Sequence, residues 1–403
     1  MLQDPPQDTP RKTTVHSLYH AGSTRRVTLI VALIVIVVAS AILAAGIGTV
    51  AIAPGDTILA LIHVPAVAVQ DFLVRTFPSG VPVLSGILVA IPAPSDTQAE
   101  LIVMGFRMPR IFLAILTGAS LAVAGVVMQG LLRNPLVSPF TLGLSSAASF
   151  GAAVAIVIGP AIVGTFAIVI GPAIVGTFAI GIGDDAFIIV MAFLFGWLSM
   201  LLVYGISRAR GTSQSTLILS GVVIGYLFQA GVMALKYTTN NDKLRDIVVW
   251  LMGGMWGASW NAVLILLPLC LVTFIVLERM AWDLNALAAG DDVAKNLGIN
   301  VGRFRLVGLM VATFAASCCL AFTGIIGFIG LMAPHICRMF IGNDHRYLIP
   351  CSALMGAAIL LISDTVARTI MSPVEIPVGI IMYIIGGIFF LFLILRGQGR
   401  GLY

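Results

Sequence analysis

Residues 283–305 read DLNALAAGDDVAKNLGINVGRFR and form a polar island between two long apolar runs, 247–277 and 306–334. The island has two short helical pieces, LNALAAG and DDVAKNLG. Each piece ends in a glycine, Gly290 or Gly298, of the kind that closes a helix in the left-handed conformation. A simple connector between two membrane spans needs only a few polar residues. The length and pattern of the island therefore predict a small folded surface that contacts another protein.

The composition of the whole chain places this island in a membrane protein. The 403 residues are 59% hydrophobic and 10% charged, with a mean hydropathy of +1.08, whereas soluble domains carry about 25% charged residues. A membrane-spanning helix needs ~20 apolar residues. We therefore predict an all-α polytopic protein with about ten transmembrane helices, at 27–50, 111–132, 141–158, 186–207, 216–235, 261–277, 306–322, a short run ending near 337, 348–367 and 376–395.

The basic residues orient these spans. Ten spans place both termini on one side of the membrane, and cytoplasmic connections carry an excess of lysine and arginine. With a cytoplasmic N-terminus, most of the 22 lysines and arginines lie inside. The sequence therefore predicts that both termini and the island, between spans six and seven, are cytoplasmic. The predicted parts are a disordered tail at 1–26, one membrane domain at 27–397 with an external loop at 51–110 and the polar loop at 281–305, and a cytoplasmic tail at 398–403.

Two features on the predicted outer side stand apart from the spans. The external loop contains an apolar patch, TILALIHVPAVAV at 57–69, which we expect to lie along the membrane surface as an interfacial helix. Between spans three and four, GPAIVGTFAIVI at 159–170 is followed directly by GPAIVGTFAIGI at 171–182. A 12-residue repeat is too short for a solenoid unit. We interpret it as a local duplication that lengthens the connection; the alternative is a re-entrant element that lines a pathway.

The chain carries no motif for catalysis or for metal binding. Its five cysteines lie in apolar segments without a CxxC pair, and we interpret them as small buried hydrophobes. The five histidines are scattered, and neither HExxH nor a GxxxxGK[ST] nucleotide-binding loop occurs. We therefore predict that the chain is not an enzyme and has no catalytic residue, metal ligand or cofactor of its own. ATP and magnesium would be bound by a separate ATPase chain.

Asp364 lies inside an apolar run, LLISDTVAR. An intramembrane carboxylate is a candidate functional residue. Because Asp364 lies four residues before Arg368, a local ion pair on one helix face is the favoured role. A secondary transporter driven by protons or sodium would need several such groups in the spans. That alternative is therefore the weaker one, and a membrane enzyme has no nucleophile or carboxylate pair to support it.

Five blocks of the sequence form a set. They are RMPRIFLAILTGASLAVAGVVMQGLLRNPLVSPFTLGLSSAASFG (107–151), LILSGVVIGYLF (217–228), GDDVAKNLGINVGRFR (290–305), GFIGLMAPHICRMFIGNDHRYLIPCSALMGAAILLISDTVAR (327–368) and EIPVGIIMYIIGGIFFLFLILRG (375–397). In this order they resemble the FecCD family, the permease subunits of binding-protein-dependent ABC importers for ferric siderophores, haem and cobalamin. The resemblance covers nearly all of 107–397, whereas residues 1–106 and the repeat carry no such pattern.

The resemblance implies a homodimer or heterodimer of ten-span subunits in a bacterial inner membrane, with the pathway between them. It implies two ABC ATPase subunits on the cytoplasmic face and an extracytoplasmic substrate-binding protein, and no nucleic-acid partner. The chain would then be a non-catalytic permease subunit of an ATP-driven importer for a metal chelate. We expect the chelate to be a ferric siderophore, with haem or cobalamin as the alternatives.

The resemblance also implies site residues on the outer face. Arg107, Arg110 and Arg368 match positions where family members present arginines to glutamates of the binding protein. Arginine suits this role because it forms forked hydrogen bonds to carboxylates. The alternative is that these arginines anchor helix ends at the lipid headgroups. Glu375 is expected to neutralise one of them.

On the cytoplasmic face, the island matches the coupling segment of the family, in which a short helix seats in a cleft of the ATPase. The implied coupling residues are Leu287, Gly290, Asp291, Asp292, Ala294, Leu297 and Gly298. The implied cytoplasmic gate consists of Asn134, Leu136, Gln214 and Ser215. Gln214 departs from the small hydroxyl residue expected at its position, so this gate would close differently.

Overall fold

The computed structural model describes residues 15–76, 91–170, 186–210 and 214–397, and all regular elements in these ranges are helices. A π-helical segment, Leu101–Arg107, leads without a break into α5. The helices are α1 Val15–Gly46, α2 Pro54–Thr76, α4 Thr97–Glu100, α5 Met108–Leu131, α6 Leu144–Ile170, α8 Ala186–Arg210, α9 Gln214–Thr238, α10 Asn241–Met252, α11 Trp260–Arg279, α12 Ala281–Ala288, α13 Asp291–Asn296, α14 Val301–Thr323, α15 Ile329–Ile341, α16 His345–Thr369 and α17 Val378–Gly397.

The ten predicted spans each coincide with one of these helices. Eight helices of the described ranges are long and apolar enough to cross a membrane. Two shorter apolar helices, Leu144–Gly159 within α6 and Ile329–Ile341, make up the remaining pair. The prediction of an all-α protein with about ten spans is therefore confirmed. The five cysteines are buried within these helices, as predicted.

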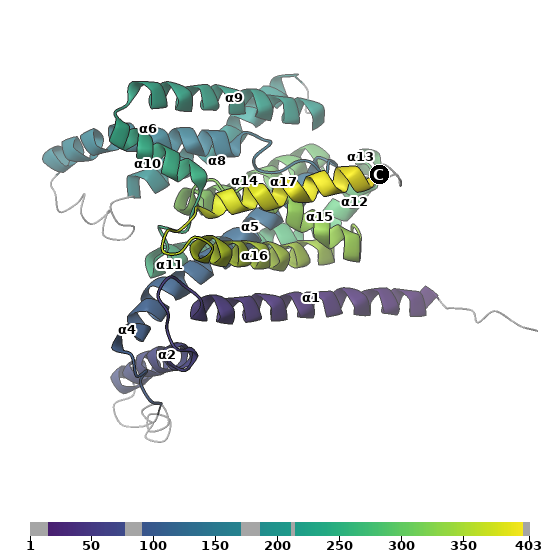
Figure 1. Cartoon of the computed structure of the whole chain (residues 1–403). Coiled ribbons are helices and arrows are strands. Elements are labelled where there is room, and N and C mark those ends of the chain that lie inside the picture. The colour runs from purple at the N-terminus through teal and green to yellow at the C-terminus, as the bar shows by residue number, and fades with distance from the viewer. Residues whose placement is uncertain (1–14, 77–90, 171–185, 211–213, 398–403) are drawn as a thin grey trace, which may run out of the picture.

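Helix α5 lies at the centre of the bundle (Figure 1). Eighteen of its 24 residues are buried, and α11, α14, α15 and α16 pack around it. Glycines allow this close packing. A Cβ atom at Gly118 would overlap the carbonyl oxygen of Gly356 in α16, and one at Gly125 would overlap the carbonyl oxygen of Gly330 in α15. Backbones of membrane helices approach this closely only where side chains are small.

The two described ends of the chain lie at the same end of the bundle, next to α12 and α13, while α2, α4 and α10 lie at the opposite end (Figure 1). This arrangement agrees with the even number of spans. We call the α12–α13 end the cytoplasmic end and the α2–α4 end the outer end. These names follow the distribution of basic residues, and the orientation itself stays a prediction.

Three segments differ from the sequence expectations or extend them. Residues 15–26, the end of the predicted disordered tail, belong to α1, and the prolines of the tail all lie upstream of this stretch; the predicted division of the chain stays a prediction. The apolar patch at 57–69 is helical, within α2. Helix α10 was not predicted, although Asn240 caps it by accepting a hydrogen bond from the Lys243 backbone N–H at 3.0 Å.

The tandem repeat is only partly visible. Its first copy, 159–170, continues α6. Its second copy, 171–182, lies outside the described residues, so both interpretations of the repeat stay predictions.

Candidate functional site

The polar island folds into the two short helices α12 and α13 at the cytoplasmic end. Gly298 has a φ of 86° and donates from its N–H to the Lys295 carbonyl at 2.9 Å, while the Ile299 N–H donates to the Ala294 carbonyl at 3.0 Å. This pair of bonds closes a helix around a left-handed glycine, as predicted. Gly290 has a φ of 130° and a ψ of 155°. It lies outside the left-handed helical region and serves as the joint between α12 and α13.

The side chains of this coupling segment, residues 281–298, fall on two faces. Leu287 and Ala294 are fully buried and pack into the bundle. Asp292 and Leu297 point outward, with Leu297 67% exposed. Of the predicted coupling side chains, these outward ones are therefore placed to contact a partner, and the buried ones hold the segment in position. Trp282, 66% exposed, was missed, although a tryptophan in a polar connector is a visible signal.

Asn285 clamps α12 to the start of α16. Its amide Nδ2 donates to Asp344 Oδ1 at 2.8 Å, and its Oδ1 accepts from the backbone N–H of His345 at 2.9 Å. Asp344 also accepts hydrogen bonds from Arg346 at 2.6–3.2 Å and from Arg26 of α1 at 3.4 Å. The hydrogen bonds from Arg346 are the main reason that the pKa of Asp344 is lowered to about 2. The coupling segment thus rests on α16, which the same aspartate ties to α1.

Asp291 faces the bundle from the first turn of α13. Its Oδ1 lies 2.9 Å from Arg133 Nη2 and 2.8 Å from Arg305 Nη2. In the orientation that satisfies both ends of its amide, the Gln214 oxygen accepts from Arg305 at 2.9 Å and from Arg133 at 3.0 and 3.1 Å. The structure therefore brings the turn after α5 and the start of α9, which carry the predicted gate residues, to one carboxylate of the coupling segment.

The turn after α5 has a defined shape. Arg133 has a positive φ of 43°, and Asn134 Oδ1 accepts a hydrogen bond from the Leu136 N–H at 2.9 Å, which is an Asx turn. Leu136 is 61% exposed, and Ser215 at the start of α9 is also exposed. Both side chains thus point away from their own subunit, as a gate shared by two subunits would require. The gate role of Asn134, Leu136, Gln214 and Ser215 stays a prediction.

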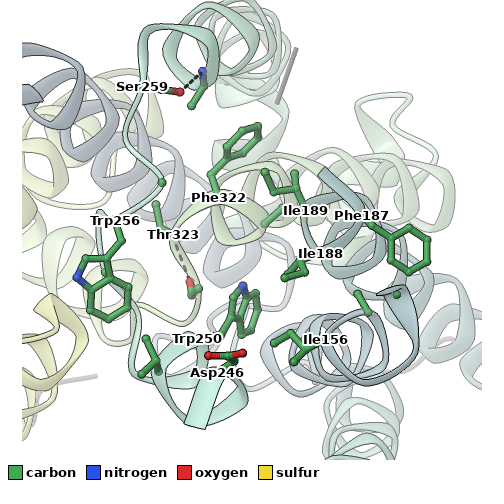
Figure 2. A pocket seen from close by; sticks show the side chains of 18 residues that line it. Ile156, Phe187, Ile188, Ile189, Asp246, Trp250, Trp256, Ser259, Phe322 and Thr323 are labelled. Atoms are coloured by element: carbon green, nitrogen blue, oxygen red, sulfur yellow. Dashed lines mark hydrogen bonds between the residues drawn. The ribbon is translucent and has the colours of Figure 1, made fainter. Parts of the chain in front are cut away.

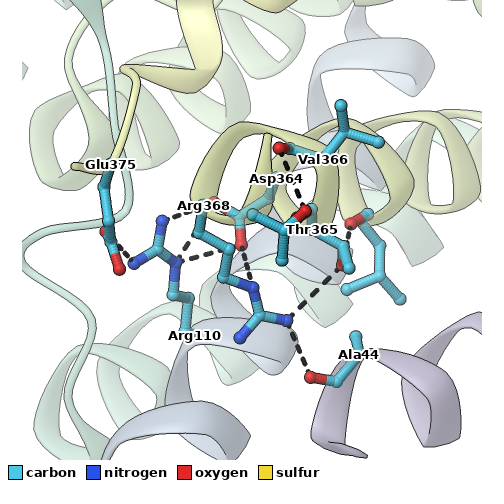
Figure 3. Close-up of polar contacts among 9 residues, drawn as sticks. Ala44, Arg110, Asp364, Thr365, Val366, Arg368 and Glu375 are labelled. Carbon is cyan, nitrogen blue, oxygen red and sulfur yellow. Dashed lines mark hydrogen bonds and ion pairs between the residues drawn. The ribbon is translucent and has the colours of Figure 1, made fainter. Parts of the chain in front are cut away.

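At the outer end, Arg107 and Arg368 turn inward and are only 5% and 3% exposed. Arg107 donates to the carbonyls of Ala45 and Gly46 at 2.7 and 3.0 Å. Arg368 donates to the carbonyl of Ala44 at 2.7 Å (Figure 3). The last carbonyls of a helix have no partner within the helix, so these two arginines stabilise the end of α1. Docking of a binding protein stays a prediction, and in this geometry neither guanidinium is presented at the surface.

Arg110 joins α5 to α16 and to the loop before α17 (Figure 3). Its Nε and Nη2 lie 2.9–3.1 Å from the Asp364 carboxylate, and its Nη1 lies 2.7 Å from Glu375. The expected neutralisation of one arginine by Glu375 is therefore confirmed for Arg110. The expected local pair of Asp364 with Arg368 is present but longer, at 3.9 Å. Arg110 is the main partner of Asp364, and no sequence spacing could indicate a pair separated by 254 residues.

A cavity of about 560 Å³ opens near the outer end, among α6, α8, α10, α11 and α14 (Figure 2). Trp250, Trp256 and Phe322 form part of its wall, and Asp246 supplies a carboxylate. Small-molecule sites typically have volumes of about 300–1,000 Å³ and mostly apolar walls. The cavity lies at the opposite end of the bundle from the Asp291 carboxylate and the gate residues, so it is not part of that cluster.

Comparisons with known proteins agree with this architecture. The model of the FecCD transport family matches residues 35–396. The Fe(3+)-citrate import system permease protein YfmE of Bacillus subtilis is 37% identical, over 74% of this chain and 83% of that protein. The hemin transport system permease protein HmuU of Yersinia pestis is 38% identical, over 73% and 83%. A solved structure described as an inward-facing metal-chelate type ABC transporter is similar with a TM-score of 0.71 and 28% identity, over 92% of this chain and 99% of that one.

Proposed function

The chain belongs to the FecCD transport family, and from this premise we propose that it forms the pathway by which an ATP-driven importer moves a ferric siderophore into the cell. The chain is a non-catalytic permease subunit of a metal-chelate type ABC importer in the inner membrane. Such an importer also contains a second permease subunit and ATPases. We propose that the substrate is a ferric siderophore and that an extracytoplasmic binding protein delivers it.

The observation that supports an ATPase partner at this end of the molecule is the outward face of the coupling segment. Leu297 and Val293 are 67% and 44% exposed on a segment that lies between spans rather than within one. Exposed apolar side chains that gather on a polar surface mark sites of protein contact. Because Asn285 and the buried Leu287 hold the segment against the bundle, this face is pre-shaped for a partner and loses little freedom on binding.

Replacing Leu297 with aspartate is expected to reduce the amount of ATPase that co-purifies with the permease several-fold. A charge would then occupy an apolar contact, and the few residues that dominate an interface cost about 2 kcal/mol or more when truncated. The measurement is the ratio of ATPase to permease after affinity purification from a strain that expresses both. Ile58→Asp is the matched control, since Ile58 is 54% exposed at the outer end, in α2. Equal losses in both variants would contradict the assignment.

The relatives support the substrate proposal only at the level of metal chelates, since the names of others give cobalamin and molybdate. The two relatives above have nearly the same identity to this chain, and their names give iron citrate for one and haem for the other. Sequence similarity therefore does not separate a ferric siderophore from haem. The proposed substrate is a ferric siderophore, and haem and cobalamin are the competing substrates.

The deciding experiment is uptake by proteoliposomes that contain the permease with its ATPase, supplied with its binding protein. Radiolabelled ferric siderophore, haem and cobalamin are offered in parallel, with and without ATP inside. We expect ATP-dependent accumulation of the siderophore, unaffected by ionophores that collapse proton and sodium gradients. Accumulation of haem or cobalamin alone would overturn the substrate, and uptake that needs an ion gradient rather than ATP would favour the secondary transporter.

A further inference from the structure

One carboxylate connects the coupling segment to both predicted gate elements. Asp291 of α13 pairs with Arg133 in the turn after α5 and with Arg305 in the second turn of α14. Gln214, the first residue of α9, bridges the same two arginines. The turn after α5, the start of α9 and the neighbouring helices α13 and α14 therefore meet in one polar cluster, which we call the Asp291 cluster: Arg133, Gln214, Asp291 and Arg305.

The carboxylate of Asp291 balances the positive charges of the two arginines in this cluster. Two guanidinium groups approach one carboxylate oxygen, and the Arg305 side chain is only 9% exposed. Arg305 Nε also donates to the carbonyl of Leu131 at 3.0 Å, at the end of α5. Interactions between charges are stronger where water is partly excluded. Without the carboxylate, the two arginines would repel each other, so Asp291 sets the position of Arg133 relative to α14 together with the neutral Gln214 bridge.

The neighbouring aspartate has a different environment. The Asp292 side chain is 93% exposed, and its ion pair, with Lys295 at 3.2 Å, lies on the surface of the same helix. Exposed pairs of this kind contribute little to stability, typically below about 1 kcal/mol. Asp291 and Asp292 thus have the same chemistry and adjacent positions. Of these two aspartates, only Asp291 forms ion pairs with residues outside α13.

The coupling segment has other anchors to the bundle besides the Asp291 cluster. Leu287 and Ala294 are fully buried beneath it, and Asn285 fastens it to the start of α16 through Asp344 and the His345 backbone. The contacts of Asp291 lead instead toward the gate. Arg133 immediately precedes Asn134, and Gln214 immediately precedes Ser215.

We propose that Asp291 is a positioning residue that transmits movement of the ATPase-facing segment to the gate, through Arg133 on one side and Gln214 on the other. This inference rests on the proposed function. A displacement of α13 moves the carboxylate, and the arginines follow because the carboxylate holds them by short, charge-assisted bonds. The turn at Arg133 and the start of α9 then shift together, so that both gate elements change position in one step.

The test compares Asp291→Asn with Asp292→Asn in proteoliposomes that contain the ATPase and receive the binding protein. Asp291→Asn is expected to keep its co-purified ATPase and its basal ATP hydrolysis. Its substrate uptake per ATP hydrolysed should fall about tenfold, which lies within the ~5–150-fold range of typical coupling between sites. Asp292→Asn leaves the Asp291 cluster intact, so its uptake per ATP hydrolysed should equal that of the wild type even where it lowers the amount of bound ATPase. Asp291→Glu, which keeps the charge, should recover part of the uptake.

A distance measurement reports the transmission directly. Spin labels placed at Leu136→Cys in both subunits of a homodimeric assembly, or at the matching position of a different second subunit, are expected to change their separation when ATP binds. This change should be lost in the Asp291→Asn background and kept in Asp292→Asn. If Asp291→Asn does not yield a monodisperse protein, Gln214→Ala breaks one arm of the cluster while leaving the ion pairs, and it should lower uptake per ATP in the same direction.

Two outcomes would overturn the inference. Wild-type uptake per ATP in Asp291→Asn would show that the gate moves without the carboxylate. If Asp291→Asn loses both the co-purified ATPase and substrate uptake, Asp291 only anchors the coupling segment. Failure of the proposed function is a separate result, since the wild-type protein itself would then take up none of the offered chelates and its variants would not be compared.

Discussion

Replacing Arg110 with alanine is expected to destabilise the protein strongly. Asp364 is 1% exposed and receives three of its hydrogen bonds from Arg110. Removing one partner of a buried ion pair costs ~3–5 kcal/mol because the remaining charge is left without compensation. The expected result is a lower melting temperature in detergent and a smaller fraction of monodisperse protein after extraction.

Two variants make this test specific. Glu375→Gln removes the other acidic partner of Arg110, whose side chain is 31% exposed, and should have a much smaller effect. The double variant Arg110→Ala with Asp364→Asn removes both charges and should recover part of the lost stability. If Arg110→Ala melts at the wild-type temperature, the ion pair does not hold α5 against α16.

Replacing Gly125 with valine is expected to prevent α5 from packing against α15. Even a Cβ atom at this position would overlap the carbonyl oxygen of Gly330. Adding side-chain volume to a packed core typically costs ~1–3 kcal/mol, and more where nothing can move aside. Here the obstacle is backbone rather than a flexible side chain, so the effect should exceed that range. The measurement is the yield of monodisperse protein and its melting temperature.

Gly205→Val is the matched control for this substitution. Gly205 lies in α8, another span, and a Cβ atom there would meet nothing within 4 Å. Its variant should fold normally. Equal yields for the two valine variants would mean that α5 and α15 do not approach as closely as the structure places them.

The predicted docking arginines Arg107, Arg110 and Arg368 are mostly buried, so their substitution affects internal contacts as well as any docking. Charge reversal of Arg107 or Arg110 would break contacts with α1, Asp364 and Glu375, so it would test folding before it tested docking. A binding protein could use these guanidinium groups only after they leave their internal partners. Any experiment on docking therefore needs a stability measurement on the same variants.

The sequence alone determined the ten spans, the polar segment between spans six and seven, and the closing role of Gly298. These features are local: a long apolar run has few alternatives to a helix in a bilayer, and a glycine with positive φ is a property of one turn. The sequence also placed Leu287, Asp291, Asp292, Ala294 and Leu297 in one segment. It could not say which of them face outward.

Only the tertiary structure decided the partners of the charged residues. Asp291 and Asp292 are equivalent in sequence, yet one joins Arg133 and Arg305 while the other faces solvent. Arg110 finds Asp364 on another helix. Spacing along a chain specifies which side chains share a face of one helix, but the direction in which that face points is set by packing against the other helices. For this protein, packing is governed by close contacts such as that between Gly118 and Gly356, which no single segment of sequence contains.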